Sequence, residues 1–116
     1  MTAYKRGDVV LVPFPFSDQT STKKRPAVII SGNLYNNASS DIVIMAITSR
    51  MDEAIGIGEC LITDWQVAGL LKPLAIKPAI STIEQKLVLK KLGGLSSKDR
   101  EAMERALKEL LSLNDK

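Results

Sequence analysis

Two groups of polar side chains in this sequence are suited to bind a phosphodiester. One group stands directly before an apolar run and the other directly after one; together they are Lys23, Lys24, Arg25, Thr48, Ser49 and Arg50. A guanidinium offers a planar fork of donors that fits a phosphate, and hydroxyl and ammonium groups add further donors. Taken separately, each group has a plainer explanation, as charges that solvate a loop or hydroxyls that satisfy a strand end. Phosphate chemistry therefore depends on whether the fold brings the two groups together.

The apolar runs beside these groups predict two buried strands. Ala27 to Ile30 is short and rich in β-branched residues, and Asp41 to Ile47 is nearly all apolar, so both belong in the centre of a sheet. We expect the first of these strands to begin after Pro26, which biases Arg25 toward an extended conformation. If the two strands are adjacent and antiparallel, the start of one lies beside the end of the other. Arg25 and Thr48 would then share a rim.

The remaining pattern predicts a small β-barrel closed by one helix. Further strands are expected at Val9 to Val12, near Glu59 to Thr63 and within Lys72 to Ile83, while Glu84 to Leu92 fits either helix or strand. Prolines at 13 and 15 should end or kink the first strand, and those at 73 and 78 suggest edges or bends. Segments 31–33 and 36–40 are turn-rich, and the glycines at 93 and 94 indicate a break.

A final helix is expected at about residues 97–113. Ser96 or Ser97 would cap it, Asp99 would complete a capping box, and an apolar stripe follows at helical spacing. Several short strands and one closing helix favour a mostly β, SH3-like barrel, with residues 1–116 as a single domain.

Charge and composition narrow the chemistry. The 116 residues carry a net charge of +3, and the first 25 residues alone hold five cations against two anions. A local basic excess favours phosphate, nucleic acid or an acidic partner. The absence of histidine excludes His-based triads, His-ligated zinc and cleavage of RNA by two imidazoles. The single Cys60 excludes an internal disulfide and is expected to be a small buried residue. No signal peptide or membrane span is recognised, so we expect the cytoplasm.

An ordered set of motifs resembles the MazF/PemK-type toxins of type II toxin–antitoxin systems. The set comprises Arg6-Gly7-Asp8-Val9-Val10, Arg25-Pro26-Ala27-Val28-Ile29-Ile30-Ser31, Ile47-Thr48-Ser49, Thr82-Ile83 and Leu92-Gly93-Gly94-Leu95-Ser96. The resemblance implies an SH3-like barrel with a C-terminal helix, assembled as a homodimer. It also implies a sequence-selective endoribonuclease that acts on single-stranded RNA without a metal or other cofactor. The implied partner is a small antitoxin whose flexible acidic tail occupies the RNA groove.

Site residues follow from the resemblance by position. Arg25 and Thr48 match the residues that the family uses for catalysis, and Asp18 to Lys24 match the loop that borders the RNA. The residues expected to bind RNA are Asp18, Gln19, Lys23, Lys24, Ser49 and Arg50. The loop departs from the family pattern because it lacks the usual glycines and glutamate.

Metal-free cleavage would use the 2′-OH of the RNA as nucleophile and leave a 2′,3′-cyclic phosphate and a 5′-OH. Arg25 would stabilise charge at phosphorus and Thr48 would bond a phosphate oxygen, whereas Asp18, Gln19 and a water are all open as the base. Two rival functions are a toxin of the same fold that poisons DNA gyrase and a non-catalytic SH3-like module that binds RNA or protein.

Overall fold

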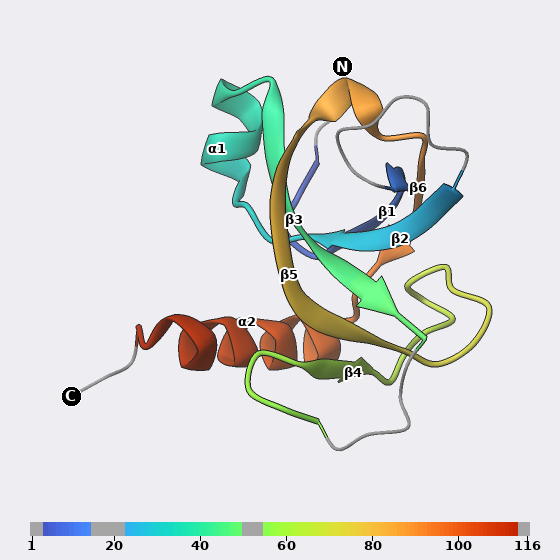
Figure 1. Ribbon diagram of the computed structural model, residues 1–116, viewed down its shortest axis with the longest axis vertical. Coiled ribbons are helices and arrows are strands. Elements are labelled where there is room, and N and C mark those ends of the chain that lie inside the picture. The colour runs from blue at the N-terminus through green and yellow to red at the C-terminus, as the bar shows by residue number, and fades with distance from the viewer. Residues whose placement is uncertain (1–3, 15–22, 50–54, 114–116) are drawn as a thin grey trace.

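The strands form a single curled sheet. The computed structural model describes residues 4–14, 23–49 and 55–113. All paired strands are antiparallel, in the order β4-β5-β3-β2-β1-β6. Their bounds are β1 Asp8–Phe14, β2 Lys23–Ile29, β3 Asp41–Thr48, β4 Cys60–Ile62, β5 Leu74–Glu84 and β6 Lys90–Gly94. Figure 1 shows the sheet curling into a half-barrel, with the C-terminal helix α2 (Ser97–Leu111) across its lower end. The predicted mostly β fold with a C-terminal helix is confirmed.

Apolar side chains pack on both faces of the sheet. One core lies between the sheet and α2 and includes Val28, Met45 and Met103, each at most 1% exposed. A second core lies on the other face and includes Ala27 and Ile44, both fully buried. Successive residues of a strand point to opposite faces, so β2 and β3 alternate between the two cores. This is why both strands appear in the sequence as continuous apolar runs.

Two expected strand boundaries were wrong, both at prolines. β1 continues through Pro13 to Phe14, and β2 begins at Lys23, before Pro26. Pro13 lies two residues after Leu11, which is the last β1 residue paired with β6, so an N–H at position 13 would point past the end of that ladder. Pro13 therefore removes no hydrogen bond from the ladder to β6, whereas the position of Pro26 faces β3, where the pairing of β2 stops. The prediction for Pro78 is confirmed, since it lies at a register shift between β5 and β3.

Two other segments also differ from expectation. Asn33–Ala38 forms a short helix, α1, where turns were expected. The glycine pair does not break the chain but forms the last two residues of β6, and the backbone of residues 67–68 packs directly against Gly93. A Cβ at Gly93 would meet the Ala68 carbonyl carbon at 2.6 Å. The ambiguous segment 84–92 divides into a 3₁₀ turn, Gln85–Leu87, and the start of β6.

Helix α2 begins as predicted but ends earlier. The Ser96 hydroxyl accepts from the Asp99 backbone N–H at 3.2 Å, and the helix stops at Leu111 with Ser112 in the left-handed conformation, φ 56°. The Asp99 carboxyl does not complete a capping box. It is 1% exposed and accepts from Thr63 N–H at 3.2 Å, the Thr63 hydroxyl at 2.8 Å and Asp64 N–H at 2.8 Å. No helix among the described ranges is long and apolar enough to cross a membrane.

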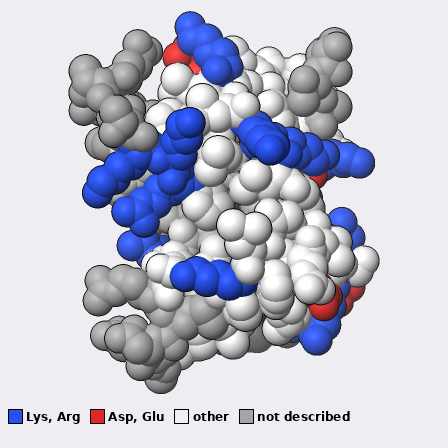
Figure 2. Space-filling model, turned by 90° about the vertical axis from the view of Figure 1, so that its right-hand side faces the viewer, with Lys and Arg blue, Asp and Glu red and all other residues white. Residues whose placement is uncertain are grey.

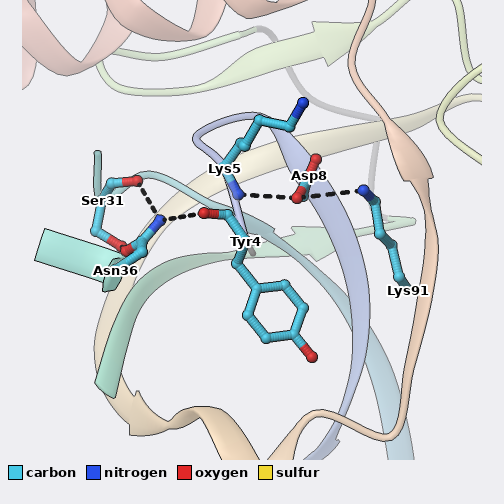
Figure 3. Close-up of polar contacts among 6 residues, drawn as sticks. All are labelled: Tyr4, Lys5, Asp8, Ser31, Asn36 and Lys91. Carbon is cyan, nitrogen blue, oxygen red and sulfur yellow. Dashed lines mark hydrogen bonds and ion pairs between the residues drawn. The ribbon is translucent and has the colours of Figure 1, made fainter. Parts of the chain in front are cut away.

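A polar cluster anchors the segment before β1 (Figure 3). The Asn36 side chain donates to the Tyr4 carbonyl at 3.0 Å. The Asp8 carboxyl accepts from the Lys5 backbone N–H at 2.9 Å and pairs with Lys91 of β6 at 3.4 Å. Burial, and secondarily Asp8, raise the pKa of Tyr4 above its ordinary value. These contacts fix the entry into β1 and thereby the sheet edge that carries β6.

Candidate functional site

The two central strands separate at one end and leave a cleft. Among the described residues, β2 pairs with β3 only over Ala27–Ile29. Beyond that point Lys23–Pro26 pair with β1, whereas Ile47 and Thr48 pair with β5. Figure 1 shows the start of β2 and the end of β3 diverging as a V.

Pro26 explains where the separation begins. Ile30 donates its N–H to the Val43 carbonyl of β3 at 2.9 Å, and in an antiparallel ladder every second residue of β2 faces the same neighbour. Val28 and then Pro26 are the next positions in that series. Because Pro26 has no N–H, the ladder lacks its next donor to β3 at the position where the pairing stops.

The cleft contains two adjoining hollows. The first has a volume of about 230 Å³ and is lined by Phe14, Arg25, Pro26, Ala46, Ile47, Thr48, Ser49 and Lys77. The second has a volume of about 340 Å³ and is lined by Lys23, Lys24, Arg25, Pro26, Ile47, Ser49, Lys72 and Leu74. Four residues line both hollows and therefore lie between them: Arg25, Pro26, Ile47 and Ser49.

Arg25 is held at the rim by an aromatic ring. In the register of β1 and β2, Arg25 pairs with Val12 and Lys23 pairs with Phe14, so Arg25 and Phe14 are diagonal neighbours on one face. The guanidinium carbon of Arg25 lies 5.1 Å from the centre of the Phe14 ring, a cation–π distance. The side chain is exposed, as expected. An exposed guanidinium supported in this way is presented to the cleft with reduced freedom.

Sequence analysis identified eight candidate catalytic or RNA-binding residues, and the structure brings five of them together. Thr48 is half-buried and Ser49 exposed at the end of β3, across the cleft from Lys23, Lys24 and Arg25. The predicted shared rim of Arg25 and Thr48 is therefore present. The three other candidates, Asp18, Gln19 and Arg50, lie outside the described residues.

Sequence reasoning missed one aromatic residue and two cations that line the cleft: Phe14, Lys72 and Lys77. Both lysines are exposed and come from the far wall, just before and within β5. A signal was available, because Lys72 precedes Pro73 and Lys77 precedes Pro78, as Arg25 precedes Pro26. A residue before proline is biased to an extended backbone, which suits a charge held at the margin of a sheet.

The cleft is strongly electropositive. Five cations line its two hollows, and among the described residues that line them none is Asp or Glu. Figure 2 shows Lys and Arg spread widely over the adjoining face, with few acidic side chains among the described atoms. In the portion of the chain that the structure describes, no three Cys, Asp or Glu residues gather closely enough to hold a metal ion. The described lining of the cleft is suited to an anion rather than to a cation.

Comparison with known proteins agrees with this geometry. A family model described as the PemK-like, MazF-like toxin of type II toxin–antitoxin systems matches residues 5–111. The chain belongs to this toxin family. No curated protein matches this toxin closely enough to add a named relative.

Solved structures share the fold of this PemK-like toxin at low sequence identity. A mycobacterial endoribonuclease in complex with its cognate antitoxin is 18% identical, with a TM-score of 0.74, and covers 97% of this chain and 96% of its own. The toxin MazF-mt6 of Mycobacterium tuberculosis is 16% identical, with a TM-score of 0.72 over 90% and 96% of the two chains. MazF of Deinococcus radiodurans is 17% identical, with a TM-score of 0.72 over 97% and 99%.

Proposed function

We propose that this toxin is a sequence-selective endoribonuclease that cleaves single-stranded RNA in the cleft between β2 and β3. The observation that carries the proposal is the placement of an exposed arginine beside the hydroxyl-bearing end of β3, in a cleft lined by five cations. Family membership and the fold shared with a mycobacterial endoribonuclease support it. A separated strand end offers room for a single strand whose bases are unpaired.

The proposed reaction is attack of the RNA 2′-OH on the adjacent phosphorus without a metal. It leaves a 2′,3′-cyclic phosphate on one product and a 5′-OH on the other. The guanidinium of Arg25 would donate to the non-bridging oxygens as negative charge develops, and Thr48 would hold a phosphate oxygen by hydrogen bonding. The lysines would neutralise neighbouring phosphates and orient the strand for in-line attack.

The proton acceptor has three candidates. Arginine is almost always protonated, so Arg25 serves as a donor and electrostatic group rather than a base. Asp18 and Gln19, in the segment that joins β1 to β2, and a bound water are the candidates for taking the 2′-OH proton. Substitution of Asp18 and of Gln19, one at a time, would distinguish a residue that accepts the proton from one that only binds RNA.

The proposed partners follow from the same charge pattern. An antitoxin with a flexible acidic tail would compete with RNA for the cations of the cleft, since both present rows of negative charge. The structure of a related toxin with its cognate antitoxin supports this partner. We also propose that the toxin works as a homodimer in the cytoplasm.

The deciding experiment compares wild-type toxin with Arg25→Ala on single-stranded RNA in excess EDTA. The loss of one transition-state donor should reduce the cleavage rate roughly 10²- to 10³-fold. The thermal melt should change little, because the Arg25 side chain is exposed. Arg25→Lys keeps the charge but not the fork of donors and should recover only a fraction of the rate. Lys108→Ala, an exposed site near the end of α2, is the charge-matched control and should cut normally.

Each rival function predicts a different result. Equal cleavage by wild type and Arg25→Ala, or none by the wild type, would overturn the proposal. Inhibition of DNA supercoiling without RNA cleavage would point to a gyrase poison. Tight RNA binding with no product would point to a non-catalytic module, and end-group analysis of any product would test for the cyclic phosphate.

A further inference from the structure

One face of the sheet beside the cleft carries an open apolar shelf, which we define as Leu11, Pro13 and Pro26. Leu11 is in register with Pro26 on one side and with Lys90 of β6 on the other, and Pro13 is in register with Lys24. Directly paired residues of antiparallel strands point to the same face. The register shift between β1 and β6 lies between Val9 and Val10, so it does not disturb these pairs. Lys24, Lys90 and the shelf therefore share one face.

The shelf is only half-buried and is bordered by lysines. Its three residues are of intermediate exposure, whereas Lys24 and Lys90 are exposed. Lys24 and Pro26 also line the larger hollow of the cleft, with Lys72 on its far wall. The shelf is thus continuous with the cleft at one end and reaches the edge strand β6 at the other.

Three lysines beside this face and the adjoining cleft have no carboxylate partner among the described residues. Within the described residues, the ion pairs of the sheet do not include Lys24, Lys72 or Lys90. The adjacent Lys91 makes the contrast, because it points to the opposite face and is paired with the buried Asp8 at 3.4 Å (Figure 3). Figure 2 shows that cations also predominate among the described side chains of the surrounding surface. An apolar shelf with unpaired cations along it fits a strand of nucleic acid better than an apolar protein segment.

We infer that RNA outside the cut site leaves the cleft over this shelf and that Lys90 binds one of its phosphates. The inference rests on the proposed function, because it takes the cleft as the site of cleavage. Neighbouring strands lie about 4.8 Å apart, so β6 is roughly 10 Å from β2. That distance places Lys90 on a different phosphate from those held by Lys24 and Arg25. Lys90 is then a binding residue that acts on long substrates and takes no role in the chemical step.

The competing explanation for Lys90 is protection of a sheet edge. Lysines on edge strands discourage pairing with other chains, and β6 is one of the two edges of this sheet. Edge protection requires a charge but no RNA contact. It predicts that loss of Lys90 promotes aggregation and leaves RNA affinity unchanged, which separates the two explanations.

The experiment measures RNA binding in an Arg25→Ala background, so that the RNA stays intact. Lys90→Ala, Lys90→Arg and the control Lys108→Ala are compared on two RNAs with the same central sequence. One is trimmed to the shortest length that the Arg25→Ala toxin still binds, and the other carries flanks on both sides. Lys90→Ala should weaken binding of the flanked RNA about two- to fivefold, the size expected for one exposed ion pair.

Further readouts make the assignment specific. The slope of log affinity against log salt should fall by about 0.7 for the flanked RNA, the value for one phosphate of a single strand. The affinity for the trimmed RNA should not change, and Lys90→Arg should restore binding of the flanked RNA. In active toxin, Lys90→Ala should raise KM for the flanked RNA without changing kcat. Unchanged affinity for the flanked RNA, or an equal loss on both RNAs, would overturn the inference. Binding is measured without cleavage, so a toxin that binds RNA but does not cut it would refute the proposed activity alone.

Discussion

Replacing Asp99 by asparagine tests whether one buried carboxyl joins helix α2 to the strand–loop junction after β4. The carboxyl of Asp99 is 1% exposed and accepts three hydrogen bonds, two from Thr63 and one from the backbone N–H of Asp64. Asparagine has nearly the same shape but replaces one acceptor oxygen by a donor NH₂. In either orientation of the amide, that NH₂ faces a donor N–H.

The expected loss follows from this mismatch. The Asn NH₂ and the backbone N–H that it faces are both left without a partner, and each such buried donor costs about 1–3 kcal/mol, so Asp99→Asn should lower the free energy of unfolding by at least about 2 kcal/mol. At about 4 °C per kcal/mol for a chain of this size, the melting temperature should fall by at least roughly 8 °C. Ser96→Ala removes the helix-cap hydrogen bond alone and should cost about 1 kcal/mol.

Urea denaturation of wild type, Asp99→Asn and Ser96→Ala gives the free energies directly. The capping variant is the matched control, because it perturbs the same helix end without touching the loop. If Asp99→Asn destabilised the protein no more than Ser96→Ala, the carboxyl would be acting only at the helix terminus. The account of it as the link between α2 and residues 63–64 would then be refuted.

Two further predictions concern the core and the loop that packs against β6. Burial, with a smaller contribution from Asp99, raises the pKa of the Cys60 thiol. The stability that the neutral thiol contributes is therefore complete below the unfolded thiol pKa of about 8.5, and it is lost as the pH rises from there through the higher pKa of the folded state. Thermal melts from neutral to alkaline pH should show this decline, and Cys60→Ala should flatten it; parallel curves would contradict the assignment. Gly93→Ala should cost about 1–3 kcal/mol in urea denaturation, because its Cβ would meet the Ala68 backbone at 2.6 Å. An unchanged midpoint would show that this close approach can relax freely.

The features of the site that could be predicted are those that depend on residues adjacent in the sequence. β2 and β3 are buried on both faces, so each gives a continuous apolar run, and the polar residues at their ends follow directly. Their antiparallel pairing then placed Arg25 near Thr48, as expected. Burial of Cys60 and the helix cap at Ser96 were also local signals and are confirmed.

The far wall of the cleft could not be predicted in the same way. Lys72 and Lys77 reach it because β5 pairs with β3 at Ile47 and Thr48, a register fixed by contacts distant in the sequence. The rule that prolines end strands also failed locally at Pro13 and Pro26. Whether a proline disrupts a sheet depends on which neighbour its missing N–H would have faced, and only the assembled sheet determines that.

The ladder that stops at Pro26 has a consequence for how the toxin would meet its ligand. Where two adjacent strands can pair along their whole length, a ligand that binds between them must compete with the hydrogen bonds that join them. Here the missing donor is a covalent property of the chain, so the gap between β2 and β3 needs no ligand to keep it open. Any strand that binds there enters a preformed opening. None of the free energy of binding is then needed to pull hydrogen-bonded strands apart, and all of it is available to order the ligand.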